Sequence, residues 1–292
     1  MSEMSEKRTK ILRLGFTECT LLAYYFYRTN NIYIKPDSLR SESDLIKWLY
    51  TTSGYYDKTV KGNYFNVIHE NNNYPNTYVN YMLSVMSFIK NSDIFGVALS
   101  KINIDNKILN LFLDNINSKD CFISKEIVYD FIKDKNVLII SPFSSLMEQQ
   151  IVSGNCKKIY SNFPNINKIY TYNFIYTFFN KGPDQNILET CNKQFEIIMN
   201  TIENNYESVI ISCGAYSVLL AEKFYNQNKN VLTIGGDLQT YFGIANNRLK
   251  KEDHVGIYKK ELESGNIQYW ITTIPDELKP VDYQRIENGC YW

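Results

Sequence analysis

Two glycine-containing turns in the second half of the chain have the residue types needed to bind an anion or a sugar hydroxyl. Cys213–Gly214–Ala215–Tyr216 follows one apolar run, and Gly235–Gly236 follows the next, with Asp237 and Gln239 directly after it. Glycine lets backbone N–H groups approach an anion at the start of a helix. Asp237 would repel a phosphate, but it suits a hydroxyl group or a cation. Alternatively, Gly235 and Gly236 only permit a tight turn.

Two other turns also present polar groups at the ends of expected strands. The segment RLGFTE at 13–18 presents Arg13, Gly15 and Glu18. Alternatively, Arg13 pairs with a surface acid and Glu18 stabilises a helix N-terminus. In Ser141–Pro142–Phe143 the proline fixes the backbone, and Phe143 could stack on a base or a sugar or pack the loop. Ligands of open α/β sheets bind at the carboxyl ends of the strands, so we expect these turns to converge on one cleft.

The composition argues against several classes of protein. The 292 residues include 31 Lys and Arg and 31 Asp and Glu, so the zero net charge predicts no nucleic-acid partner. No apolar run reaches the roughly 20 residues of a membrane span, and the N-terminal residues are polar. We therefore expect no transmembrane segment and a cytoplasmic location, or a host's cytoplasm for a viral chain. Six scattered cysteines and two histidines argue against a structural zinc, a disulfide scaffold and a histidine-rich metal site.

Alternating apolar runs and helical patterns predict the elements that position these turns. The pattern predicts an α/β fold with a Rossmann-like, mainly parallel central sheet flanked by helices. We expect a single domain over 1–292, with a mostly helical insertion at 29–93 and a C-terminal extension at 250–292. The final residues, 288–292, are expected to dock, either for stability alone or at the mouth of the cleft. Strands are expected near 10–15, 94–99, 137–140, 169–172, 209–212 and 231–234, and helices near 18–28, 44–50, 77–90, 120–133, 145–152 and 186–204. Leu219, Leu220 and Phe224 recur at helical spacing and predict one more helix.

Five segments of the chain form one further pattern: RLGFTE (13–18), VLIISPF (137–143), ISCGAYSVLLAEKF (211–224), IGGDLQTYFGI (234–244) and ENGCYW (287–292). Together they resemble a family of polysaccharide-biosynthesis proteins. That family is in turn similar to the glycosyltransferases of the GT-D fold. The resemblance implies transfer of a sugar from a nucleotide-sugar donor to a carbohydrate acceptor, in glycan or polysaccharide biosynthesis. It also implies that the glycine-rich stretch borders the active site.

The resemblance also assigns roles to residues. GT-D enzymes carry an Asp-x-Glu motif after the first strand, and here Phe16 stands at the aspartate position and Glu18 at the glutamate position. One carboxylate holds Mn²⁺ or Mg²⁺ weakly against water, so a metal, if one binds, would need Glu18 and Asp237 together. Glu18, or else Asp237, would act as the catalytic base. The implied donor-binding residues are Arg13, Gly15, Ser141, Pro142, Phe143, Cys213, Gly214, Ala215, Tyr216, Gly235, Gly236, Gln239 and Arg248.

Two other classes of function stay open at this point. A nucleotide-cofactor enzyme, such as a methyltransferase acting on sugars, would also use the turn at Gly214 with Asp237 downstream. No GxGxG loop follows an early strand, however. A non-catalytic carbohydrate-binding relative is the other alternative, because Phe16 replaces the motif's aspartate. The donor sugar, the acceptor, the stereochemical outcome and a homo-oligomeric state are not fixed by the sequence.

Overall fold

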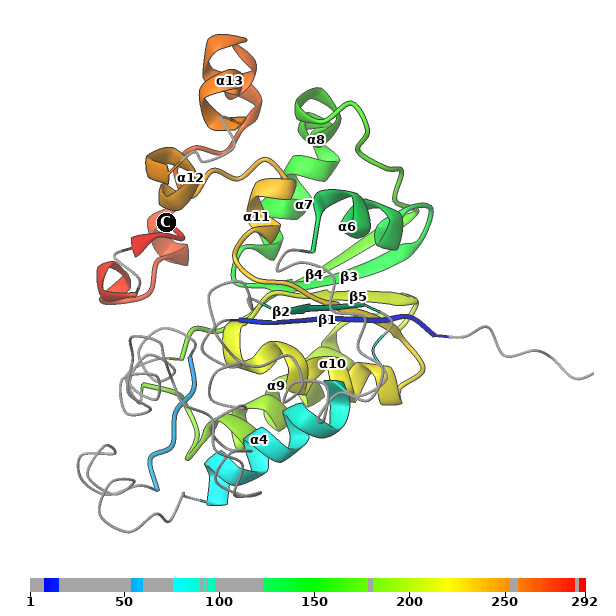
Figure 1. Ribbon diagram of the computed structural model, residues 1–292, viewed down its shortest axis with the longest axis vertical. Coiled ribbons are helices and arrows are strands. Elements are labelled where there is room, and N and C mark those ends of the chain that lie inside the picture. Colours follow the sequence, from blue (N-terminus) through cyan, green and yellow to red (C-terminus); the bar gives the residue numbers. More distant parts are fainter. Residues whose placement is uncertain are drawn as a thin grey trace, which may run out of the picture.

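The computed structural model describes residues 8–15, 54–59, 76–89, 92, 94–97, 123–177, 181–252, 257–286 and 289–292. Most of the predicted insertion at 29–93, including the helix expected at 44–50, lies outside these residues, and so does the helix expected at 18–28. Phe16 and Glu18 lie outside them as well. The described residues form an α/β structure in which helices cover both faces of one central sheet (Figure 1).

The sheet has six strands, and every neighbouring pair is parallel. Its order is β2-β1-β6-β5-β3-β4, so that the N-terminal β1 pairs with the last strand. A strand buried on both faces is continuously apolar, and this explains runs such as Val137–Ile140, which is fully buried. The Rossmann-like prediction is confirmed. The strands are β1 Lys10–Leu14, β2 Ile94–Val97, β3 Asn136–Ser141, β4 Lys168–Asn173, β5 Ser208–Ile211 and β6 Asn230–Thr233.

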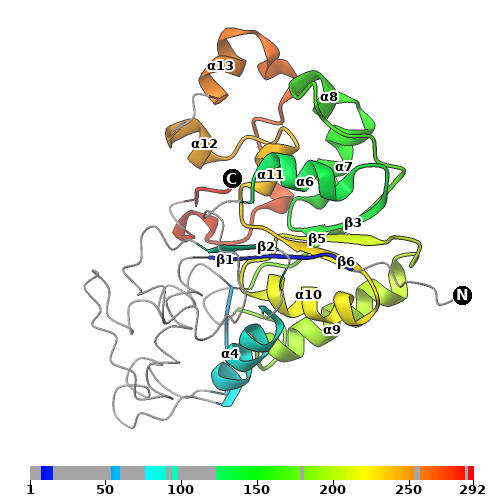
Figure 2. The ribbon, with the colours of Figure 1, turned by 45° about the vertical axis from the view of Figure 1, so that its right-hand side comes forward.

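Helices pack against both faces of the sheet (Figure 2). One face is covered by α4 (Asn76–Ile89), α9 (Ile187–Thr201) and α10 (Ser217–Asn226). The other face is covered by α6 (Lys125–Ile132), α7 (Ser144–Val152), α8 (Asn155–Ile159) and α11 (Leu238–Tyr241). The later residues form α12 (Asn247–Glu252), α13 (Ile257–Glu263) and short 3-10 helices at Asn266–Tyr269, Asp276–Leu278 and Tyr283–Arg285.

Side chains at fixed positions begin two of these helices. Ser124 Oγ accepts a hydrogen bond from the N–H of Ile127 at the start of α6. Asn186 Oδ1 accepts one from the N–H of Glu189 at the start of α9, at 3.0 Å. Both are N-cap interactions, which satisfy N–H groups that have no partner within the helix.

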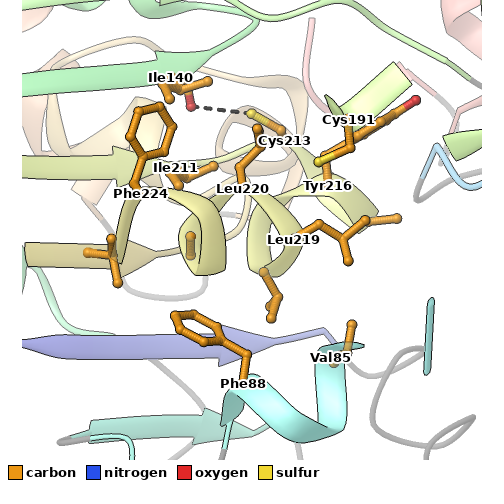
Figure 3. Close-up of a cluster of buried hydrophobic side chains, with 14 of the residues drawn as sticks. Val85, Phe88, Ile140, Cys191, Ile211, Cys213, Tyr216, Leu219, Leu220 and Phe224 are labelled. Carbon is orange, nitrogen blue, oxygen red and sulfur yellow. Dashed lines mark hydrogen bonds between the residues drawn. The ribbon is translucent and has the colours of Figure 1, made fainter. Parts of the chain in front are cut away.

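Two apolar cores hold these layers together. Figure 3 shows the first, a buried cluster that includes Leu220 and Phe224 of α10 and Phe88 of α4. The second core lies on the opposite face, where Ile139 and Leu232 of the sheet pack with α6 and α7. No helix in the described part of the chain combines the length and the apolar character needed to cross a membrane.

The connections after neighbouring strands leave the sheet toward opposite faces. The chain passes from β5 into α10 on one face, whereas it passes from β6 into α11 and from β3 into α7 on the other (Figure 2). Such a reversal is a topological switch point, at which ligands of open α/β sheets bind. The turns after β5 and β6 therefore stand at the expected position for a binding site.

Candidate functional site

The turn after β5 is built around Gly214. This residue has φ +56°, a left-handed conformation that glycine adopts without strain. The N–H of Cys213 donates a 2.9 Å hydrogen bond to Ser217 Oγ, and the N–H of Tyr216 donates to the Cys213 carbonyl. Within the described residues, nothing accepts a hydrogen bond from the N–H groups of Gly214 and Ala215. The turn thus leaves two backbone donors for a ligand.

Two side chains of this turn point into the protein interior. The Cys213 thiol donates to the Ile140 carbonyl at 3.4 Å, as Figure 3 shows, and burial raises its pKa well above the ordinary value. The thiol therefore stays protonated and is no nucleophile. The Tyr216 hydroxyl forms a 2.6 Å hydrogen bond with Thr177 Oγ1. At these two positions the N–H groups and the side chains are all hydrogen-bonded within the protein, so the free donors of this turn are the N–H groups of Gly214 and Ala215.

The turn after β6 is joined directly to the turn after β5. Ser212 Oγ donates a 3.1 Å hydrogen bond to the carbonyl of Gly235. In the part of the chain that the structure covers, the N–H groups of Gly235, Gly236 and Asp237 have no acceptor. Ser212 was not among the predicted site residues. Its only signal in the sequence is that a polar residue ends an otherwise apolar run.

Arg13 of β1 lies over this second turn. Its backbone N–H donates a 2.8 Å hydrogen bond to Thr233 Oγ1, which continues the contact between β1 and β6 beyond the pair Ile11 and Leu232. Its guanidinium lies where a side chain at position 235 would begin. A Cβ on Gly235 would be only 1.9 Å from Arg13 Nη1. Glycine at 235 therefore leaves the space that Arg13 occupies.

The charges at this position are not paired with one another. Arg13 Nε is buried and has no hydrogen-bond acceptor among the described residues. Within the same residues, neither Arg13 nor the half-buried Asp237 forms a salt bridge. Both lie within electrostatic reach of Tyr241, whose hydroxyl pKa is raised mainly by burial, raised further by Asp237 and lowered by Arg13. A guanidinium, a carboxylate and five backbone donors thus lie around two linked turns.

Residues 289–292 lie against the turn after β6, and we call them the clasp. Figures 1 and 2 show the C-terminal residues beside the carboxyl ends of the strands. A Cβ on Gly236 would fall 2.2 Å from Cε1 of Tyr291, so the tyrosine ring rests directly on this glycine. Gln239 Nε2 donates to the Tyr291 carbonyl at 3.1 Å, and Arg248 lies 5.4 Å from the Tyr291 ring centre. Gln239 and Arg248, both predicted as ligand-binding residues, therefore contact the clasp.

The predicted Ser141–Pro142–Phe143 turn has a structural role in the described residues. Ser141 is buried, and its Oγ accepts a hydrogen bond from the N–H of Phe143. Phe143 is only 4% exposed, and its ring packs edge-on against Tyr176 and Trp292. Of the two interpretations of Phe143, the structure places it in loop packing. The side chain was identified, but its partner in the clasp could not be recognised from local sequence.

No family model, no curated protein and no solved structure matches this chain. The site is therefore interpreted from its own geometry. That geometry brings Arg13 and Asp237 together with the turns at Gly214 and Gly235, and it places Gly15 directly after β1. Glu18 falls outside the described residues, so its predicted role stays a prediction.

The donor set of the described residues fits a divalent cation poorly. No three His, Cys, Asp or Glu side chains within them lie close enough together to hold a metal ion. Among the described residues, Asp237 is the one carboxylate at the site, and a positively charged guanidinium lies in the same electrostatic environment. Mg²⁺ and Mn²⁺ bind through several oxygen ligands. The described residues therefore do not form a site for Mg²⁺ or Mn²⁺.

Proposed function

We propose that this protein is a glycosyltransferase that binds the diphosphate of a nucleotide sugar at the linked turns after β5 and β6. Transfer to a carbohydrate acceptor, in glycan or polysaccharide biosynthesis, is the proposed reaction. The observation that carries the proposal is the Arg13 guanidinium, which lies on Gly235 without an anionic partner among the described residues.

An arginine in this environment favours an anionic ligand. A buried polar group without a hydrogen bond costs about 1–3 kcal/mol, and a charged group costs more. A phosphate bound beside Gly235 would supply the negative charge and the acceptor oxygens that the Arg13 guanidinium lacks among the described residues. The free N–H groups of Gly214, Ala215, Gly235 and Gly236 would supply further donors to a second phosphate. This combination supports a diphosphate as the bound group.

The proposed reaction is a single displacement of the diphosphate. The acceptor hydroxyl oxygen forms a bond to the anomeric carbon, and the bond from that carbon to the diphosphate oxygen breaks. The electron pair of the broken bond stays on the nucleoside diphosphate, whose charge is stabilised by Arg13 and the backbone N–H groups. The hydroxyl proton passes to a carboxylate, for which Asp237 is the candidate within the described residues.

Binding of UDP and of inorganic pyrophosphate, measured by isothermal titration calorimetry, tests this proposal first. The two probes share the diphosphate, so pyrophosphate reports on the anion site without dependence on the base. The wild-type protein should bind both, and Arg13→Ala should weaken both by about 100-fold, since hydrogen bonds to charged groups contribute about 1.5–3 kcal/mol. Arg13→Lys keeps the positive charge but loses the planar guanidinium. Its affinity for both probes should lie between those of the wild type and of Arg13→Ala.

A panel of radiolabelled nucleotide sugars then tests the reaction itself. Transfer or slow hydrolysis of one donor, lost in Asp237→Asn with UDP binding retained, is the expected result. Binding of S-adenosylmethionine in place of diphosphates would instead favour the methyltransferase class. Tight UDP binding without turnover of any donor would favour the non-catalytic class.

A further inference from the structure

The clasp contacts the turn that forms part of the proposed diphosphate site. Tyr291 Cε1 and Cδ1 lie 2.2 and 2.8 Å from the position of a Cβ on Gly236, so the ring fills the side-chain space of that glycine. Gly236 is the central residue of the turn whose N–H groups lack acceptors in the described part of the chain. The ring therefore limits how this peptide can move.

Hydrogen bonds and packing fix the clasp on both sides of Tyr291. The Tyr291 carbonyl accepts a hydrogen bond from Gln239 of α11, the helix that follows the turn. The Cys290 carbonyl accepts one from the N–H of Arg248 at 3.1 Å. Trp292 is 4% exposed and packs among Phe143 and other aromatic rings. Anchors before and after Tyr291 thus hold its ring at one position over the turn.

We propose that the clasp is part of the diphosphate site and that Tyr291 is a positioning residue. It holds the Gly235–Gly236 turn in the conformation in which the free N–H groups meet the ligand. The inference rests on the proposed function, because it concerns the same site. A flexible glycine turn loses conformational entropy when it binds an anion, and a turn that is already held loses less.

The first test compares Tyr291→Ala with Tyr291→Phe. We expect Tyr291→Ala to weaken the binding of UDP and of inorganic pyrophosphate by the same factor, about tenfold, which corresponds to ~1.4 kcal/mol. Tyr291→Phe should keep the affinity, because the contact to Gly236 is made by ring carbons. Tyr269→Ala is the matched control, since Tyr269 is a half-buried tyrosine of the same C-terminal extension whose ring has Lys158 as its cation partner. Melting temperatures establish that each variant is folded when titrated.

The second test is a double-mutant cycle between Gly236→Ala and Tyr291→Ala. In the wild-type background the new Cβ and the ring cannot occupy the same space, so Gly236→Ala should displace Tyr291 and weaken pyrophosphate about tenfold. In the Tyr291→Ala background the space is empty, and Gly236→Ala should cause no further loss. Non-additivity of this kind is the signature of direct coupling between two residues.

The possible outcomes distinguish a failure of the inference about the clasp from a failure of the proposed function. Full affinity of Tyr291→Ala together with a large loss in Arg13→Ala would overturn the clasp and leave the proposed function intact. If Tyr291→Ala binds UDP more weakly but pyrophosphate as tightly as the wild type does, Tyr291 contacts the nucleoside. That result would also overturn the positioning role. If Tyr291→Ala binds the probes more tightly than the wild type does, the clasp obstructs the site, and the positioning role is overturned. A wild-type protein that binds neither probe contradicts the proposed function itself.

Discussion

Replacing Gly235 by alanine is the smallest change that separates Arg13 from the proposed ligand. The new Cβ would lie 1.9 Å from Arg13 Nη1, and ordinary van der Waals contact begins near 3.4 Å, so the guanidinium must retreat. The clash involves the end of a flexible side chain, and Gly235 does not have a positive φ. The protein should therefore stay folded, but the guanidinium should move away from its present position.

The size of the effect follows from Coulomb's law. At an effective dielectric constant of about 20, two unit charges attract by about 4 kcal/mol at 4 Å and by about 2.8 kcal/mol at 6 Å. A retreat of about 2 Å therefore removes ~1.4 kcal/mol, and the affinity for UDP or pyrophosphate should fall about tenfold. Arg13→Ala, which removes the charge altogether, should weaken binding more than Gly235→Ala does.

Isothermal titration calorimetry at one fixed ionic strength measures these affinities, because added salt screens the same attraction. Gly235→Ala in the Arg13→Ala background is the internal control. It should have no further effect there, since the group it displaces is gone. Unchanged affinity of a folded Gly235→Ala protein would refute the reasoning. So would an equal loss in both backgrounds, which would show that the alanine acts on the turn itself.

Three further predictions concern stability and reactivity. Gly182→Ala would place a Cβ 1.9 Å from Cζ of the buried Tyr56 ring; overpacking of this kind should lower the free energy of unfolding by about 3 kcal/mol, as measured by urea denaturation. Lys193 holds the pKa of Asp184 below its ordinary 3.8, so this pair stabilises the fold above that pH and the stabilisation is lost as the pH falls through the lower folded value. The stability difference between wild type and Asp184→Asn should therefore shrink between pH 7 and pH 3, and a constant difference would contradict the pairing. Cys213 should resist thiol reagents at pH 8 until the protein unfolds, because its thiol is buried with a raised pKa; labelling of native Cys213, detected by mass spectrometry, would contradict its placement.

The strands were predictable because each is a short apolar run between polar turns. The runs expected at 209–212 and 231–234 correspond to β5 at Ser208–Ile211 and β6 at Asn230–Thr233. The order of the strands was not predictable in the same way. Nothing in the residues of β6 specifies that it lies between β1 and β5, since all these strands present apolar side chains on both faces.

The residues of the site were likewise predictable from the sequence, whereas the contacts between them were not. Gly214, Gly235 and Arg13 were identified by residue type and by their position at strand ends. The contact of Arg13 with Gly235 depends on the pairing of β1 with β6, and local sequence carries no information on that pairing. The position of Tyr291 on Gly236 likewise joins segments that are far apart in the chain. Residue type identified the groups, and tertiary structure decided which of them meet.

The position of β6 in the sheet also has a consequence for how the chain is made. It is the only strand that joins the pair β2-β1 to the group β5-β3-β4 within the described sheet, and it is the last strand in the chain. Thr9 and Asn230, which meet where β1 and β6 begin to pair, are 221 residues apart in sequence. During synthesis β1 therefore lacks its central neighbour until Asn230–Thr233 have left the ribosome. Contacts of such long range slow folding and leave strand edges exposed meanwhile. Arg13, the residue that carries the proposed anion site, thus reaches its final surroundings only after Thr233, 220 residues later in the chain, has been made.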